Sequence, residues 1–125
     1  MTADANRVIW SCERATTAVE FAFILPALAA LVVGGLYTSL VVYSAAGLRS
    51  AVEQAARCYS VNVTQCSSAS TTQTYAQSRY HGIKAPTFTA SIQPCGHQVI
   101  GTVTIAVIAV VIDFSIPLSA TACFP

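Results

Sequence analysis

The stretch Arg14–Ser44 reads RATTAVEFAFILPALAALVVGGLYTSLVVYS, and it decides the fold class of this chain. No charged residue occurs between Phe21 and Tyr43, and as an α-helix this run is about 35 Å long. The hydrocarbon core of a bilayer is about 30 Å thick, so the run predicts a transmembrane helix. The alternative is a helix buried in a protein core, which is uncommon for so long an apolar run in a small domain.

The composition of the whole chain points in the same direction. Hydrophobic residues make up 54% of the 125 residues and charged residues only 9%, whereas a soluble domain has about a quarter charged residues. The formal net charge is +1 and no basic run occurs, so the electrostatic footprint of a nucleic-acid-binding protein is missing. The length allows one small domain beside the membrane helix.

The cysteines are distributed unevenly about the apolar run. Cys12 precedes it, and four cysteines follow it: Cys58, Cys66, Cys95 and Cys123. An even set on one side indicates an oxidising compartment there. Two arginines precede the run and two follow it closely, so the positive-inside rule does not determine the orientation of the span. From the cysteines we expect the N-terminus, a short head without folding potential, in the cytoplasm and the remainder outside.

A cleavable secretory signal is a second interpretation of the same run. Ser44-Ala45-Ala46 offers the small residues that signal peptidase requires, with cleavage near Ala46. However, the run exceeds the about 7–15 apolar residues of a signal peptide, and basic residues are not concentrated at its start. On this interpretation the protein is a secreted or membrane-anchored, disulfide-bonded binding domain.

Glu20 is a single acid at the leading edge of the span. A carboxylate near a bilayer costs free energy, less so at the interface than at the centre. Glu20 is therefore either solvated among the headgroups, where it also favours the positive end of a helix that begins near Thr16 or Thr17, or it has a partner. Its position alone does not choose between these interpretations.

The residues around Glu20 resemble the processing site of type IV pilins and pseudopilins. The segment Arg14–Phe21 reads RATTAVEF. In that family a prepilin peptidase cuts at the cytoplasmic face after a small residue and leaves a glutamate as the fifth mature residue. With a cut between Ala15 and Thr16, Glu20 is the fifth residue. The resemblance therefore implies a processing site at Ala15 and Thr16.

The string AVEFAFILP, Ala18–Pro26, more specifically resembles the TadE/TadF pseudopilins of the tight-adherence pilus. Those proteins share a short head, a cut site at a small residue, an AVEFAL-like run and a proline one turn later. The resemblance extends from Ala15 to about Arg57, a third of the chain. It departs from the family at Ala15, where glycine is usual.

The resemblance implies a role for three residues of the span in assembly and register: Glu20, Phe21 and Pro26. Cleavage would create an α-amino group at Thr16, which is protonated at neutral pH. Pairing of Glu20 with the Thr16 amine of a neighbouring subunit would relieve the cost of two charges in an apolar setting and set the helix register. In pilins a proline such as Pro26 is associated with helix unwinding during assembly. A tolerated membrane proline is the alternative.

The expected function is that of a minor pilin or pseudopilin that takes part in assembly of a tight-adherence pilus. The implied partners are other pilin subunits, the prepilin peptidase, the inner-membrane assembly platform driven by a cytoplasmic ATPase, and membrane lipid. The implied location is the bacterial inner membrane, single-pass with the N-terminus in the cytoplasm, and later the pilus or the cell surface.

Helical periodicity continues beyond the span, so the predicted helix extends from about Thr17 to Cys58. Arg49, Glu53 and Arg57 are four residues apart on one face, which is either solvated or a contact between subunits. The expected organisation is a cytoplasmic leader at 1–15, a transmembrane helix at 16–44, an extracytoplasmic stalk helix at 45–60 and a small disulfide-stapled α+β head domain at 61–125.

The head is expected to hold one short helix and three antiparallel strands packed on the stalk, an α+β, pilin-like fold. The expected elements are a helix at Thr71–Tyr80 closed by Gly82, a strand at Pro86–Pro94, a long central strand at Val99–Ile112, a turn at Asp113 and Ser115, and a last strand at Ile116–Cys123. The central strand is apolar on both faces near Ile108, Val110 and Ile112, and its second face needs a cover from a neighbouring subunit or the short helix.

The four outer cysteines allow three disulfide pairings. We prefer Cys58–Cys66, which would clip the end of the stalk to the following loop, together with Cys95–Cys123, which would join the ends of two paired strands.

Residues that carry chemistry are scarce. His81 and His97 are the only histidines, and no CxxC accompanies Cys95-Gly96-His97, so we expect no metal site and no cofactor. The chain has neither a nucleophile motif nor a glycine-rich phosphate loop, so we expect no catalytic residues and no enzyme activity.

Overall fold

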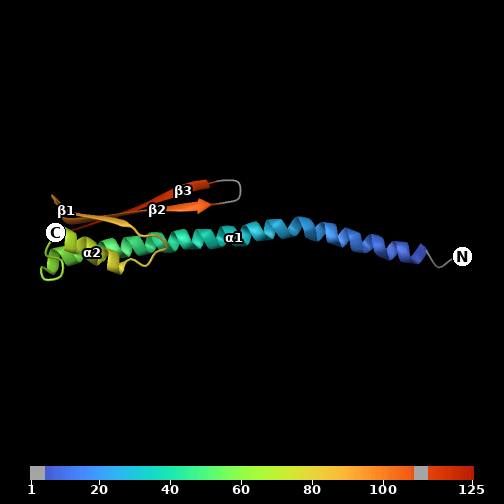
Figure 1. Cartoon of the computed structure of the whole chain (residues 1–125), viewed down its shortest axis with the longest axis horizontal. Coiled ribbons are helices and arrows are strands. Elements are labelled where there is room, and N and C mark those ends of the chain that lie inside the picture. Colours follow the sequence, from blue (N-terminus) through green and yellow to red (C-terminus); the bar gives the residue numbers. More distant parts are fainter. Residues whose placement is uncertain (1–4, 109–112) are drawn as a thin grey trace. The chain divides into compact units, whose positions relative to one another are not determined.

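The computed structural model of the chain describes the backbone of residues 5–108 and 113–125 and the side chains of residues 18–107 and 114–125. In chain order, the elements are α1 (Ala5–Val61), α2 (Ala69–Arg79), β1 (Thr87–Gln93), β2 (Gly96–Ile108) and β3 (Asp113–Phe124) (Figure 1). The predicted α+β layout, with a long apolar helix, a short helix and a three-stranded antiparallel sheet, is confirmed.

The chain divides into two compact units, Met1–Tyr37 and Thr38–Pro125, and α1 contributes to both of them. The predicted start of the helix is wrong, because α1 begins at Ala5 rather than near Thr17. No glycine or proline occurs between Ala5 and Pro26, so nothing in the local sequence stops a helix there. The helix is also continuous across Pro26, without local unwinding in the described range.

The core of the second unit lies where the last part of α1 packs on the sheet. Side chains at three- and four-residue steps along α1 are buried: Ser44, Leu48, Ala51, Val52, Ala55 and Ala56. Phe88, Ala90, Val99 and Val103 bury their side chains in the same core from β1 and β2. The alanines let the helix approach the sheet closely, and the larger side chains fill the remaining space.

Gly101 is the point of closest approach between α1 and the sheet. An ideal Cβ at this position would lie 2.7 Å from Phe88 Cε1, 2.8 Å from Val52 Cγ2 and 2.9 Å from Leu48 Cδ1. No side chain fits between the strand and the helix here. Glycine at 101 is therefore required by packing rather than by backbone conformation.

The sheet has the order β1-β2-β3, so the prediction that the strand expected at Val99–Ile112 is the central one is confirmed. Thr87–Gln93 pairs with Gly96–Thr102, and the following part of β2, 103–108, pairs only with β3. As a result the β2–β3 pair continues past the end of β1 (Figure 1). Gly96, with a φ of +116°, completes the tight turn Pro94-Cys95-Gly96 that joins β1 to β2.

The second face of the described sheet is rich in hydroxyl side chains. Exposed residues on it include Thr87, Thr89, Thr102, Thr104, Ser119 and Thr121. This alternation lets one face contact water, so no cover is needed there. The predicted doubly apolar region at Ile108, Val110 and Ile112 lies outside the described side chains. Helix α2 joins the same core as α1, through Ala76 and the adjoining Tyr80.

Two predicted boundaries are wrong. Helix α2 begins at Ala69 with Ser68 as N-cap, because Ser68 Oγ accepts from the Thr71 N–H at 3.3 Å and Thr71 Oγ1 accepts from the Ser68 N–H at 3.0 Å. It ends at Arg79, and Gly82 does not close it. A Cβ on Gly82 would instead overlap the Tyr80 hydroxyl, so this glycine makes room for a core tyrosine.

The predicted turn at Asp113 and Ser115 is also wrong. Both residues belong to β3, where Asp113 pairs with Ile108 and Ser115 with Ala106. The predicted strand Val99–Ile112 corresponds to β2, which extends to Ile108, and residues 109–112 lie outside the described part of the chain.

Two disulfides fasten the end of the second unit that carries the C-terminus. Cys58 and Cys66 are bonded with their Cα atoms 5.8 Å apart, and Cys95 and Cys123 with theirs 6.2 Å apart. These are the pairs preferred from the sequence. The first clips the end of α1 to the following loop, and the second joins the turn before β2 to the end of β3.

We expect Gly101→Ala to destabilise the second unit by about 1–3 kcal/mol, because the added methyl group has no space. Urea unfolding of the full chain in detergent micelles, followed by near-ultraviolet circular dichroism of the tyrosines, measures this change. Gly34→Ala is the matched control, since nothing lies within 4 Å of a Cβ at that position. Equal unfolding midpoints for the two variants would contradict the proposed packing constraint.

The two disulfides should contribute unequally to stability. They close loops with sequence separations of 8 and 28 residues, for which chain entropy predicts about 2.5 and about 3.6 kcal/mol. Replacing Cys95 and Cys123 by serine should therefore lower the free energy of unfolding by about 1 kcal/mol more than replacing Cys58 and Cys66. The same urea titration compares the two double variants, and the opposite order would refute the loop-length argument.

Candidate assembly segment and outer-domain surface

The apolar segment of α1 has no protein cover in the described chain. Every side chain from Ala18 to Leu40 is exposed. One helix, described over Ala18–Val61, is long and apolar enough to cross a membrane, and none of its most apolar 18-residue window is buried. The interpretation of this segment as a buried core helix is therefore wrong. An exposed apolar surface of this extent requires lipid or other apolar helices around it.

The predicted processing and register residues lie on consecutive turns of this helix. The backbone of Ala15 and Thr16 is helical, and their side chains lie outside the described set. Glu20 is exposed, and Phe21 beside it is 63% exposed. Thr16 and Glu20 are four residues apart, so their backbone positions lie on one helix face about 6 Å apart along the axis. The fold thus brings the predicted new terminus and Glu20 to the same place.

The charged face of the stalk is only partly paired. Arg49 Nε donates to Glu53 Oε1 at 3.1 Å, and both side chains are mostly exposed. Such an exposed pair contributes about 0.3–0.5 kcal/mol. Arg57, the third member of the predicted series, has no ion pair with the described residues. This face is solvated in the single chain.

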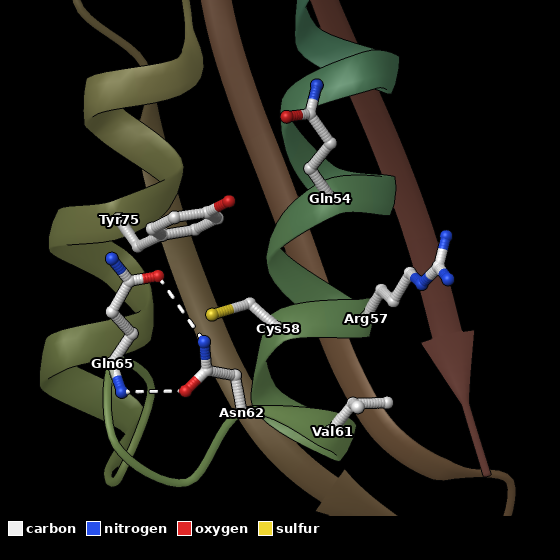
Figure 2. A pocket seen from close by; sticks show the side chains of 7 residues that line it. All are labelled: Gln54, Arg57, Cys58, Val61, Asn62, Gln65 and Tyr75. Atoms are coloured by element: carbon white, nitrogen blue, oxygen red, sulfur yellow. Dashed lines mark hydrogen bonds between the residues drawn. The ribbon is translucent and has the colours of Figure 1, made fainter.

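A shallow cavity of about 250 Å³ lies at the end of α1 beside α2 (Figure 2). Its lining residues are Gln54, Arg57, Cys58, Val61, Asn62, Gln65 and Tyr75. Asn62 has a structural role, because its Oδ1 accepts from the Gln65 N–H at 3.1 Å and so closes the loop after α1. The Arg79 guanidinium lies over the Tyr75 ring, 5.0 Å from its centroid. The cavity is open, and no carboxylate lines it.

His97 and the neighbouring Cys95 do not form a metal site among the described residues. Cys95 is bonded to Cys123, so it offers no thiolate. The His97 ring packs edge-on against Tyr59 with ring centroids 4.4 Å apart. Among the described residues, no group of three or more potential metal ligands comes together. His97 therefore has a packing role at the start of β2, and the sequence alone did not suggest this role.

Comparison with known proteins finds a family match for the segment that contains the exposed part of α1. Residues 15–57 match the family model for TadE-like proteins. No curated protein and no solved structure gives a significant match to the chain. The matched range begins at Ala15, includes Glu20 and Pro26, and ends at Arg57 near the end of α1. This segment, about a third of the chain, is similar to TadE-like proteins.

Proposed function

We propose that this protein is a minor pilin or pseudopilin that a prepilin peptidase processes between Ala15 and Thr16 and that takes part in assembly of a tight-adherence pilus. The observation that carries the proposal is the family match over 15–57, a range that contains Ala15, Thr16, Glu20 and the exposed apolar part of α1. The role is structural, and the partners are other pilin subunits, the peptidase and the inner-membrane assembly platform.

On this proposal, residues 1–15 are a cytoplasmic leader and residues 16–44 cross the inner membrane. Residues 45–60 form the outer stalk, and residues 61–125 form the head domain in the oxidising compartment. The two disulfides support this orientation, because all four of their cysteines follow the span. In an assembled filament, apolar helices of neighbouring subunits would replace lipid around the exposed segment.

Glu20 would set the register between neighbouring helices. After cleavage, each subunit would present an ammonium at Thr16 and a carboxylate at Glu20 on one helix face. An unpaired charge in an apolar bundle is costly, whereas a charge-assisted hydrogen bond between subunits satisfies both groups. Only one axial offset between neighbouring helices permits this pairing, so it would specify how far each subunit advances. Phe21 would pack beside the pair.

Pro26 would be the weak point of the helix during assembly. It cannot donate to the Ala22 carbonyl, so α1 lacks one backbone hydrogen bond there. Because the helix is continuous across Pro26 in the single chain, unwinding would be a step of insertion into the filament rather than a property of the free subunit.

The alternative is a secreted or membrane-anchored binding domain released by cleavage near Ala46. This is the less supported function, because such a cut falls within the part of α1 that carries the core. Ser44 on one side of the cut is fully buried and Leu48 on the other side is 1% exposed. Cleavage there would remove the first core contact and leave a frayed helix end under the sheet.

The decisive experiment is the intact mass and the N-terminal residue of the protein from membranes of its native host. A chain that begins at Thr16 supports prepilin-type processing. A chain that begins near Gly47 identifies a secretory signal and supports the binding domain. A chain of full length identifies a membrane anchor and contradicts the proposed processing.

The residue before the cut should control this processing. We expect Ala15→Gly to be cleaved at least as completely as the native chain, because glycine is usual there in the resembling family. A bulky side chain does not fit a site that accepts small residues, so Ala15→Leu should accumulate as full-length precursor. Intact mass spectrometry of membrane extracts measures the cleaved fraction. Normal cleavage of the leucine variant would place the site elsewhere.

Removal of the charge at Glu20 should affect assembly and leave processing intact. We expect Glu20→Gln to be cleaved at Thr16 and to enter sheared pili at least tenfold less than the native chain, since about 1.4 kcal/mol of lost pairing corresponds to tenfold. The matched control is Glu53→Gln, which removes an exposed acid of the stalk. Normal incorporation of Glu20→Gln would refute the register role.

A further inference from the structure

Two contacts establish how β2 runs along the second half of α1. The His97 ring packs against the Tyr59 ring, and a Cβ at Gly101 would meet both Leu48 and Val52. From His97 to Gly101 the strand advances about 13 Å. From Tyr59 to the midpoint of Leu48 and Val52, the helix returns about 13 Å toward the membrane span. Strand and helix are therefore nearly antiparallel, and positions along β2 convert directly into positions along α1.

By this correspondence, the end of the β2–β3 pair that includes Ile105 and Phe114 lies level with the apolar run of α1. Ile105, which pairs with Ile116, lies about 13 Å beyond Gly101 and therefore level with about Val41. The next pair that faces the helix includes Phe114 and lies about 7 Å further. The apolar run Phe21–Tyr43 that forms the span ends at Tyr43. The end of the β2–β3 pair thus extends past the outer limit of the span.

The loop between α2 and β1 lies at headgroup depth. A Cβ at Gly47 would be 3.8 Å from the Tyr80 ring, so the loop begins about 6 Å above Tyr43. It ends at β1, whose first residue pairs with Thr102, next to Gly101. Within this loop Ile83 is 58% exposed and is followed by the exposed Lys84. The headgroup layer is about 5–7 Å thick on each side of the hydrocarbon core.

We propose that this end of the outer domain docks on phospholipid of the outer leaflet, through Ile83 and Lys84 in the headgroup layer and through Phe114 and Ile116 at the boundary with the acyl chains. Phe114 is 48% exposed although it is on the helix-facing side of the sheet. Lys84 adds attraction to anionic headgroups.

Polar groups limit the depth of this contact. Thr104 and Ser115 are exposed on the opposite face, and Asp113 is the only charged residue from Ile105 to Pro125. The part of β2 beyond Thr102 has no strand on one side in the described sheet, and unpaired backbone groups cost several kcal/mol in hydrocarbon. The docked depth is therefore that of interfacial segments, about 5–10 Å into the boundary, and not a second crossing.

The proposal concerns the subunit while it is in the membrane. It requires α1 to span the bilayer with the outer domain on the far side, and it depends neither on cleavage at Ala15 nor on entry into a filament. Lipid docking would hold the outer domain against the membrane before assembly, and release from lipid would accompany extraction of the subunit.

Tryptophan quenching in bilayers tests the depth directly. Trp10, the only tryptophan, is replaced by phenylalanine, and single tryptophans are introduced as Ile83→Trp or Phe114→Trp in the full chain. The chain is reconstituted in vesicles of phosphatidylcholine and phosphatidylglycerol. Controls are Val63→Trp and Ile92→Trp, because both side chains are exposed and Ile92 pairs with His97 at the distal end, about 24 Å beyond Tyr43.

We expect brominated phospholipid to quench tryptophan at 83 and 114 several-fold more strongly than at 63 and 92, and aqueous iodide to show the reverse order. Equal iodide quenching at all four positions would overturn the proposal. Shielding of 83 and 114 from both quenchers would also overturn it, because it would identify a protein neighbour, such as a second copy of the chain, in place of lipid.

The contribution of Lys84 is tested by the lipid composition. Omission of phosphatidylglycerol should weaken the brominated-lipid quenching at position 83, and Lys84→Gln should remove this dependence. Arg57→Gln is the control, because Arg57 is an exposed cation about 21 Å beyond Tyr43. If Lys84→Gln behaves as Arg57→Gln does, the headgroup contact of Lys84 is refuted.

Discussion

The close packing of the second half of α1 on the sheet is the constraint on which the rest of the structure depends. Leu48 and Val52 lie directly over Gly101, where no side chain separates helix and strand. This contact makes one helix serve two environments. Its first part presents apolar side chains outward over its whole circumference, and its last part buries one stripe in a protein core. The second unit is thereby built directly on the last part of α1 rather than joined to this helix by a linker.

Much of this arrangement follows from residue patterns that are local. The uncharged run before Ser44 predicts the span, and β-branched alternation predicts the central strand. Cysteine positions at the ends of elements favour the pairing that the structure contains. The resemblance of Ala15–Arg57 to the TadE-like family is also evident from the sequence alone, because it rests on contiguous residues, and the family match covers the same range.

The errors concern contacts that residues make only in the folded chain. Gly82 resembles a helix terminator, but it serves the Tyr80 ring, which only the fold brings above it. Asp113 and Ser115 resemble turn residues, but β2 pairs with both of them. The role of Gly101 could not be predicted either, because a glycine in a strand of alternating apolar and polar residues does not indicate that a helix packs on it. The packing of His97 on Tyr59 likewise joins residues that are far apart in sequence.

The shared helix has a mechanical consequence. Tension on the apolar part of α1 passes into the second unit through helical backbone alone, because the helix is unbroken from Ala5 to Val61. Such a load pulls the helix lengthwise along β2, so many side-chain contacts resist it together rather than one after another. The Cys58–Cys66 bond anchors the end of the helix covalently to the next segment. A pull on the apolar part of α1 would therefore carry the second unit along in the folded state.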